Sequence, residues 1–465
     1  MKALLTSCFL VFQLLLCYSQ NKQLLYNFNT IPQSLLLNPG TDINFKGYVG
    51  FPMLSGIHAN IGSSGIAAYD LFAADNIDFN VKVNAAINSL KKNDAFKLNE
   101  QIDIINVGFK SNKLTHNDFY SFGIYQELDM FSYWPQDIAT LLYEGNFSNI
   151  GKSFNLGHIS SRAEMLMVYH FGINRKLTNK LTVGARAKLY NSFVEASSIH
   201  NKGSFITQLG SNNIYTHTLS TDIAIRTSGI KSLENSNNPG KELLTRAFLG
   251  GNLGVGFDGG FSYSLSDQKK ITASVTDVGF IWYTKDVESF ELNGSYTFEG
   301  IELFFPIISN NTDFNDYWED LKDEIEENIQ YTKNNNSYVR LRPIKLNASY
   351  EYNFGRKQNE DCNCDTSYLE DKYLNALGVQ LFAVTRPRGP EVALTGFYYR
   401  KLFDALHVKA TYTVDKYSFT NIGLGVSSQL GPINLHLLAD NLLEFQNLAN
   451  ANTLSMQFGI NYIIK

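Results

Sequence analysis

The sequence predicts an all-β fold, a transmembrane antiparallel up-and-down β-barrel of about 14 strands, within a range of roughly 12 to 16. Three observations predict it: an aromatic-rich composition, repeated runs of alternating apolar and polar residues, and an export signal at the start of the chain. Aromatic residues make up 13% of the 465 residues, with 33 Phe and 26 Tyr, and charged residues only 18%. Aromatic side chains suit a pleated, half-buried surface, so this composition favours strands.

The first 19 residues have the features of a secretory signal peptide. Lys2 supplies the positive start, the run from Ala3 to Leu16 is almost wholly apolar, and Ser19 offers a small residue for cleavage after it. The run is shorter than the roughly 20 residues that a membrane-spanning helix needs. Leu16 stands before Cys17 where a lipoprotein needs a small residue, so we discount lipidation. We therefore expect export, cleavage near Ser19 and a place in the cell outer membrane.

Alternation is clearest over residues 454–464. One face carries Leu454, Met456, Phe458, Ile460, Tyr462 and Ile464, and the other carries Ser455, Gln457, Gly459 and Asn461. Successive side chains of a strand point to opposite faces, so this run predicts a strand with one apolar and one polar face. Similar runs of about ten residues, the length that a tilted strand needs to cross a membrane, occur at 181–190, 253–265, 344–354 and 406–412.

A soluble β-sandwich would also alternate, but two features favour the barrel. The polar faces carry both glycine and charge, as a wet or self-packed lumen tolerates, and the apolar faces end in Tyr or Phe as an interfacial girdle does. In addition, tight turn signals at 265–268 and 430–432 predict hairpins between neighbouring strands. Outside the signal no run of 18 apolar residues occurs, which excludes a helical membrane protein.

Some stretches depart from the strand rhythm. Residues 20–44 predict an extended N-terminal segment, and the barrel is expected to occupy 45–465, with its first strand near Phe45. Residues 286–340 predict a long insertion, within which residues 313–330 place Tyr317, Trp318, Leu321, Ile325 and Ile329 at helical spacing and so predict an acidic amphipathic helix. Residues 134–164 predict a second long loop.

No catalytic or cofactor motif emerges. Gly254–Gly259 matches the dinucleotide-binding pattern G-x-G-x-x-G, but the glycines lie within one alternating strand instead of a turn between a strand and a helix. The eight histidines lie apart, none at a metal-ligand spacing, and the net charge of −5 lacks the basic footprint of a nucleic-acid partner. We therefore expect no enzyme activity, no catalytic residues, no cofactor, no metal and no nucleic-acid partner.

Cys362 and Cys364 stand one residue apart in the segment DCNCD at 361–365. In an oxidising compartment they are compatible with a small strained disulfide, or with a metal site that includes Asp361 and Asp365. Structural zinc usually takes four ligands and the exported chain holds no second cysteine pair, which disfavours the metal. The residues leave open whether the pair forms a disulfide or only decorates a loop.

Polar and charged residues on the polar faces are the candidates for the lumen. They would set ion selectivity in an open pore, and would pair with one another in a filled barrel. Because both signs are present, we favour a filled interior. The candidate residues are Arg186, Lys188, Asp258, Lys345, Glu351, His407 and Lys409.

The last third of the chain resembles a known family. The segments YSFTNIGLGV at 417–426, LGPINLHLLADNLL at 430–443 and FGIN at 458–461 look like the ending of an uncharacterised outer-membrane barrel family. Its relatives include PorP/SprF-type proteins of the type IX secretion and gliding systems and, more distantly, PorV and FadL-type barrels. The segment LLLNP at 35–39 is similar to the Asn-Pro motif near their N-termini. In FadL-like barrels the N-terminal segment folds into the lumen, so the resemblance implies a plug at residues 20–44.

Three functions are weighed on this basis. The resemblance implies a non-enzymatic barrel that serves envelope assembly, secretion or gliding, with outer-membrane lipid and envelope or secretion-system proteins as partners. The alternative is a passive FadL-like channel for small hydrophobic molecules, which the barrel size and the implied plug favour. A lesser alternative is an outer-membrane lipase, which would need a serine within hydrogen-bond reach of a lipid-facing histidine.

Overall fold

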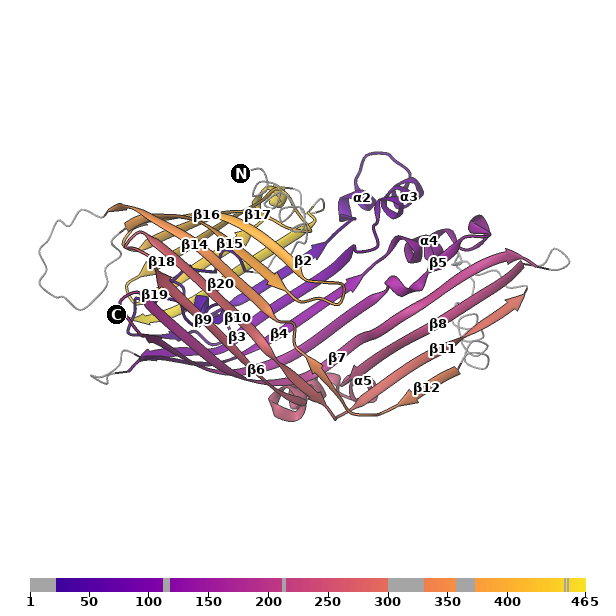
Figure 1. The fold of residues 1–465 in the computed structure, drawn as a ribbon, viewed down its shortest axis with the longest axis horizontal. Coiled ribbons are helices and arrows are strands. Elements are labelled where there is room, and N and C mark those ends of the chain that lie inside the picture. The colour runs from indigo at the N-terminus through magenta and orange to yellow at the C-terminus, as the bar shows by residue number, and fades with distance from the viewer. Residues whose placement is uncertain are drawn as a thin grey trace, which may run out of the picture.

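The computed structural model describes residues 22–111, 118–210, 215–299, 330–356, 373–446, 449 and 451–465. Its strands form a closed antiparallel barrel of 14 positions (Figure 1), which confirms the predicted fold class and strand number. Closure satisfies the hydrogen bonds of every strand edge, as a barrel in lipid requires.

The order around the ring follows the order along the chain. β1 (Gly47–Gly50) and β2 (Ile57–Ser63) share one position between β20 (Thr453–Ile464) and β3 (Ala95–Lys110). The ring then passes through β4 (Asp118–Tyr133), β6 (Ser160–Lys176), β7 (Leu181–Leu209), β9 (Asn252–Ser264) and β10 (Lys269–Tyr283).

β13 (Tyr338–Leu341) and β14 (Lys345–Arg356) share the next position. The remaining strands are β15 (Tyr373–Val384), β16 (Glu391–Phe403), β17 (Leu406–Val414), β18 (Asn421–Leu430) and β19 (Ile433–Asp440). β19 pairs with β20 and closes the ring. The predicted hairpins at 265–268 and 430–432 are confirmed as the β9–β10 and β18–β19 turns.

The barrel buries its polar residues and exposes its apolar ones. Along β9, Leu253, Val255 and Phe257 are exposed, whereas Asn252 and Asp258 are buried. Along β20, Met456 and Tyr462 are exposed while Ser455, Gln457 and Asn461 are buried. A soluble sandwich would show the reverse arrangement, because its apolar faces form the core. The outer surface is therefore suited to hydrocarbon and the lumen to polar groups.

Exposed aromatic side chains gather at both ends of the barrel wall, as in the girdles of membrane barrels. One set lies near the end of the barrel that holds the C-terminus: Phe109, Phe171, Tyr263, Phe403 and Tyr462. The other set lies near the opposite end: Phe96, Trp134, Trp282 and Phe419. We call the first the terminal end and the second the extension end.

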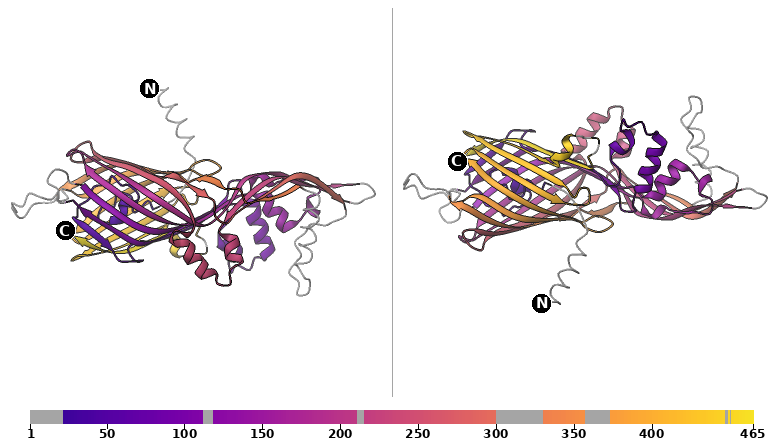
Figure 2. Two further views of the ribbon diagram at one scale, coloured as in Figure 1. Left: turned by 90° about the horizontal axis from the view of Figure 1, so that it is seen from below. Right: turned by 90° about the horizontal axis from the view of Figure 1, so that it is seen from above.

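At the extension end the wall continues beyond the rim on one side (Figures 1 and 2). β7 is 29 residues long, and its far half leaves the ring to pair with β5 (Ser153–Asn155) and β8 (Tyr215–Ser228). β8 pairs with β11 (Val287–Glu299), and β11 pairs with β12 (Gln330–Asn334). We call the sheet of these strands, β5, β7, β8, β11 and β12, the extension.

The two faces of the extension continue the two faces of the barrel wall. On the face that carries the lumen residues of β7, hydroxyl groups pair across strands, Thr218 with Thr297 at 3.1 Å and Ser220 with Ser295 at 2.8 Å. On the opposite face, Phe154, Phe205 and Leu219 form an apolar row that Leu141 covers. Leu141 belongs to α4 (Gln136–Glu144).

Short helices occupy the longer connections at the extension end (Figure 2). α2 (Ala68–Phe72) and α3 (Phe79–Ser89) connect β2 to β3, and α5 (Ile230–Glu234) and α6 (Pro239–Thr245) connect β8 to β9. One-turn segments are η1 (Pro32–Leu36), η2 (Phe147–Asn149), η3 (Leu156–His158), η5 (Arg246–Gly250) and η6 (Leu442–Gln446). No helix of the described chain has both the length and the apolar character to cross a bilayer.

The structure differs from the sequence-based prediction in two of the irregular stretches. Residues 286–340 contain β11, β12 and all of β13 except its last residue, so much of this stretch is strand that the alternation did not reveal. Residues 134–164 hold α4, β5 and the start of β6. The signal peptide at 1–19 and the acidic helix at 313–330 lie outside the described residues, apart from Gln330, which begins β12.

An arginine on the outer wall tests the lipid-facing surface. Phe257 lies near the middle of β9 with 63% of its surface exposed. The F257R variant should lower the free energy of unfolding in lipid vesicles by about 2–4 kcal/mol, because the bilayer midplane penalises its charge. The measurement is urea unfolding followed by tryptophan fluorescence. Phe72 on α2 is equally exposed but lies off the barrel wall; F72R is the control, and an equal loss in both variants would contradict the lipid-facing assignment.

Candidate functional site in the barrel lumen

The N-terminal segment, described from residue 22, lies inside the barrel as far as Thr41 and reaches the wall at Lys46, which bonds to the backbones of β20 and β3. Its apolar side chains Leu24, Leu25, Phe28 and Ile31 are buried. Its backbone runs through consecutive one-turn bends, from Lys22 to η1 and on to Thr41, each closed by local hydrogen bonds. A chain folded on itself in this way fills volume without an edge that must pair with the wall.

One half of the lumen, bounded by β15–β20, holds the apolar side of the segment. Leu24, Leu25, Phe28 and Ile31 cluster with Leu438 of β19. Phe28 also meets the ring of Tyr399 edge-on, with the ring centroids 5.7 Å apart. The wall leaves room for the segment on β18, because a Cβ atom at Gly423 would press against Leu24 and one at Gly425 would press against Leu438 and Phe28. These close contacts explain why glycine occupies both positions.

The polar groups of the segment bond to the wall around most of the ring. Lys409 of β17 donates to the carbonyl of Tyr26 at 2.6 Å, and Gln380 of β15 donates to that of Gln23 at 2.6 Å. Gln33 and Asn461 of β20 exchange two amide bonds of 3.0 Å. On the other side, Ser274 of β10 donates to Leu37 and Arg186 of β7 to Leu36.

The opposite half of the lumen is crossed by a continuous band of ion pairs. Asp258 binds Arg186 and Lys188, each at 2.9 Å, and Lys188 also binds Asp277 at 2.6 Å. Lys345 links Asp277 to Glu127, at 2.9 and 3.2 Å. We call the set formed by these residues together with Arg342, Glu164 and Arg162 the ionic band.

Arg342 extends the ionic band across the lumen. It stands between β13 and β14 and binds Glu127 of β4 at 3.1 Å as well as Glu164 of β6, which Arg162 also binds at 2.7 Å. Three ring positions lie between β6 and the shared position of β13 and β14, and four lie between β4 and that position. The band therefore ties together walls that are far apart around the ring. Its members are paired and, except for the partly buried Lys345, buried, as charges in a dry interior must be.

The structure brings most of the sequence-predicted lumen residues into these contacts. Arg186, Lys188, Asp258 and Lys345 belong to the ionic band, and Lys409 binds the N-terminal segment. His407 is buried beside Tyr399, with a hydrogen bond of 2.5 Å. Glu351 faces the terminal-end cavity and accepts from Asn353 at 3.1 Å. Cys362 and Cys364 lie outside the described residues.

Sequence reasoning missed three of the four carboxylates of the ionic band, and two of its three arginines, Arg162 and Arg342. Glu127, Glu164 and Asp277 lie within β4, β6 and β10, and their polar phase in these strands was a usable signal. Asp277 sits at a bulge where the register shifts between Val275 and Val278, which obscures the alternation there. Arg342 precedes Pro343 between two short strands, and no periodicity marks it.

A loop crosses the lumen at the extension end. Arg386, in the β15–β16 loop, pairs with both carboxylate oxygens of Asp129 on β4, at 2.9 and 3.3 Å, and its guanidinium lies 4.8 Å from the ring centroid of Phe131. Arg388 of the same loop stacks on Tyr133 and donates to the carbonyl of Lys92. β4 and β15 lie on opposite sides of the ring. We call this arrangement the latch.

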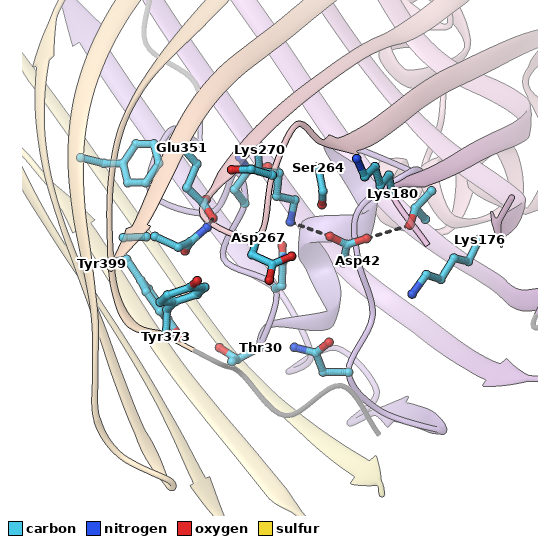
Figure 3. A pocket seen from close by; sticks show the side chains of 18 of the residues that line it. Thr30, Asp42, Lys176, Lys180, Ser264, Asp267, Lys270, Glu351, Tyr373 and Tyr399 are labelled. Carbon is cyan, nitrogen blue, oxygen red and sulfur yellow. Dashed lines mark hydrogen bonds and ion pairs between the residues drawn. The ribbon is translucent and has the colours of Figure 1, made fainter. Parts of the chain in front are cut away.

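At the terminal end a polar cavity of about 630 Å³ opens between the N-terminal segment and the wall (Figure 3). Asp42 of the segment binds Lys270 of β10 at 2.7 Å and accepts from Thr182 of β7 at 2.8 Å. Burial, the largest single influence, would raise the pKa of Asp42, but the ammonium of Lys270, the hydrogen bond from Thr182 and the charge of Lys176 together outweigh it and hold the pKa below its usual range. The cavity is also lined by Lys176, Lys180, Asp267, Glu351, Tyr373 and Tyr399.

The described residues offer no complete hydrolytic site. Ser455 and His58 come within 3.4 Å, but both are buried in the lumen instead of facing lipid, and Nδ1 of His58 has no hydrogen-bond partner. A serine nucleophile needs a base that a third group orients, so this pair lacks the arrangement. In the part of the chain that the structure describes, no cluster of three or more His, Cys, Asp or Glu is placed to hold a metal.

Comparison with known proteins gives one family match and several solved structures of low similarity. Residues 39–440 match a family of unknown function, DUF5723. No curated protein sequence matches the chain. Among solved structures, the toluene transporter TodX of Pseudomonas putida is similar at 10% identity over 93% of this chain and 92% of its own, with a TM-score of 0.37. The Ralstonia pickettii toluene transporter TbuX is similar at 9% identity over 93% of this chain and 94% of its own, with a TM-score of 0.40. A Pseudomonas aeruginosa FadL homologue is similar at 9% identity over 94% of this chain and 95% of its own, with a TM-score of 0.38.

Breaking the ionic band at its centre should destabilise the barrel. D277N leaves Lys188 and Lys345 without their shared carboxylate in a buried site. Removing one partner of a buried pair typically costs about 3–5 kcal/mol, so the free energy of unfolding should fall by that order. Urea unfolding in vesicles measures it. The matched control is E234Q on α5, whose carboxylate is exposed; a D277N variant as stable as this control would show that the ionic band is not needed for stability.

Proposed function

We propose, from the premise that the chain belongs to the DUF5723 family of unknown function, that it is an outer-membrane channel for small molecules, held closed by its own N-terminal segment. The observation that carries the proposal is the division of the lumen into two halves. The ionic band ties the walls from β4 to β14 to one another, whereas the half along β15–β20 is filled by residues of the N-terminal segment. Withdrawal of that segment would open a path along β15–β20.

The contacts of the segment are suited to reversible closure. Within the described residues it meets the wall through hydrogen bonds and apolar packing, and its charged partners, such as Asp42 with Lys270, lie near the cavity at the terminal end. The ionic band, by contrast, joins wall to wall, so it would keep the barrel in shape when the segment leaves.

The side chains behind the segment favour polar or amphipathic passengers. The inward positions of β16–β20 include Thr395, Thr411, Ser427, His436 and Gln457, all buried. Such a wall offers hydrogen bonds along the path, which a polar solute can use and a hydrocarbon cannot. Small hydrophobic molecules, the passengers expected from the sequence, are the alternative that the transport experiment separates.

The orientation follows from the lengths of the connections. Bacterial outer-membrane barrels have short turns on the periplasmic side and long loops outside. Two-residue turns join β16 to β17 and β18 to β19 at the terminal end, whereas the helices and the extension occupy the other end. We therefore place the terminal end and its cavity in the periplasm, and the latch and the extension on the cell surface.

One observation favours the second candidate, a role in envelope assembly. The extension projects beyond the rim (Figure 2), where it could contact a partner and contributes nothing to a pore. Under this proposal the barrel is a closed scaffold. Co-purification of an envelope protein with the full chain, lost when the extension is replaced by a short loop, would support it.

Planar-bilayer conductance separates the two candidates. The full exported chain should give no sustained current, and a variant that lacks residues 20–44 should give stable single-channel steps, because the half of the lumen along β15–β20 is then empty. Liposome uptake of small sugars and of aromatic hydrocarbons by the shortened variant then distinguishes the passengers. A shortened barrel that folds but carries no current would contradict the channel and favour the scaffold.

A point variant tests the same closure without a deletion. Phe28 is fully buried against the wall, and a carboxylate there cannot be desolvated without a partner. F28D should weaken the packing of the N-terminal segment against the wall, so that the segment leaves the lumen at times and the channel gives intermittent current. N44D is the matched control, because it adds the same charge to an exposed position of the same segment. Equal currents from both variants would mean that the packing of Phe28 does not hold the channel closed.

The latch should act as a second closure. Since Arg386 crosses the lumen to Asp129, R386Q in the variant without residues 20–44 should raise the single-channel conductance above that of the deletion alone. R400Q is the control, since Arg400 is exposed at the far end of the same hairpin. If both substitutions leave the conductance unchanged, the β15–β16 loop does not restrict the path.

A further inference from the structure

The connection from β8 to β9, residues 230–250, lies against the outside of the barrel wall. Leu243 of α6 and Ala247 of η5 pack on Met167 of β6 and Phe193 of β7. Figures 1 and 2 show these helices outside the barrel, below the point where β7 leaves the ring for the extension. We call residues 230–250 the outer hairpin.

The outer hairpin begins where the exposed wall ends. On the outward face of β6, Phe171 is 49% exposed, whereas Met167, two outward positions further, is 3% exposed because the hairpin covers it. Met167 lies nine residues before Lys176, the terminal-end limit of β6. That distance is about 30 Å along a strand at roughly 3.3 Å per residue, or about 23 Å along the barrel axis for a tilt of about 40°. The lipid band of such barrels is about 25 Å tall, so the hairpin lies at its outer boundary.

Polar contacts fix the hairpin in this place. The guanidinium of Arg246 is buried, donates to the carbonyl of Phe193 at 3.1 Å and lies 3.5 Å from the carboxylate of Asp286. Asp286, in the β10–β11 connection, also accepts from the backbone and side chain of Ser232. Asn191 of β7 donates to the carbonyls of Arg246 and Ala247.

Beside these buried anchors, three large apolar side chains point away from the protein. Leu244, Phe248 and Leu249 are 63%, 67% and 48% exposed. Leu249 has a φ of 60°, a left-handed conformation that bulky residues rarely adopt. Strain of this kind persists where the surroundings hold it, and it often marks a functional position. The strained turn here presents Phe248 and Leu249 outward.

We propose that the outer hairpin is a membrane-interface anchor, whose Leu244, Phe248 and Leu249 enter the outer boundary of the lipid and so hold the extension in a set position over the membrane. Its occupant is lipid because the patch is continuous with the lipid-facing wall: β9 follows the hairpin directly and begins with exposed Leu253 and Val255. Trp282 of β10, exposed near the same rim, marks the interface level.

Burial of these side chains in an acyl environment explains their exposure in the protein alone. Burying leucine and phenylalanine side chains removes apolar surface from water, which is favourable. A short amphipathic segment with Trp, Phe and Leu on one face binds at the boundary of headgroups and acyl chains in this way. The proposal rests on the membrane barrel alone and holds whether the lumen conducts or not.

Spin labelling of the full chain in phospholipid vesicles tests the anchor. Single cysteines replace Phe248, Phe257 and Phe72 in a background with C362S and C364S, and each is labelled with a nitroxide. Phe257 is the lipid-facing control and Phe72, 72% exposed on α2, is the control for a position off the wall. Power saturation compares collision with oxygen, which concentrates in lipid, and with a water-soluble nickel chelate.

The label at 248 should show an oxygen-to-nickel ratio severalfold above that at 72 and below that at 257, because residue 257 lies nearer the middle of the lipid band. All three sites are exposed, so the substitutions leave the barrel intact, and retarded migration of unheated samples on a gel confirms folding. A ratio at 248 equal to that at 72 would overturn the anchor and would mean that the patch faces water or a protein partner. This result does not depend on the channel proposal. It would stand even if the variant without residues 20–44 carried no current.

Discussion

The structure depends on one constraint, that hydrocarbon offers no hydrogen-bond partner to a peptide group. A closed antiparallel ring meets it, because each strand has a neighbour on both sides. Closure then dictates the side chains. With apolar residues such as Phe257 outside, the polar residue at every second position must point into the lumen, and those that carry charge need partners there. The ionic band forms because these charged side chains point into the lumen and pair with one another there.

The two fillings of the lumen are coupled through one residue. Arg186 binds Asp258 within the ionic band and also donates to the backbone carbonyls of Leu35 and Leu36 in the N-terminal segment. Its buried guanidinium has enough donors to serve both sides at once. Under the proposed withdrawal of the segment, Arg186 would lose these acceptors but keep its carboxylate partner Asp258, so its charge would stay paired. A lysine has a single nitrogen at its tip and could not reach both Asp258 on the wall and the backbone carbonyls of the segment in the same geometry.

The barrel could be predicted from the sequence because the alternation of apolar and polar residues along a strand is a local signal. β9, β14, β17 and β20 read directly from it, and so did the inward phase of Arg186, Lys188 and Asp258. The charge pairs themselves did not, because Lys345 finds Glu127 through the closure of the ring and not through nearby sequence. The extension was hidden for a related reason: β7 shifts register between Ser192 and Val194, and again between Ser198 and His200, and each shift reverses the phase of the alternation.

These register shifts also explain how one strand serves two structures. A bulge increases twist and redirects a strand, so β7 can follow the ring as far as Ser192 and then leave it. At that point the outer wall loses the neighbours that β9 supplied, and the polar edge is covered by β8 and by the buried bonds of Asn191 and Arg246. The outer hairpin thus lies where the ring and the extension separate. Its exposed leucines and phenylalanine then follow the same rule as the barrel wall, with apolar groups turned to lipid and polar groups turned inward.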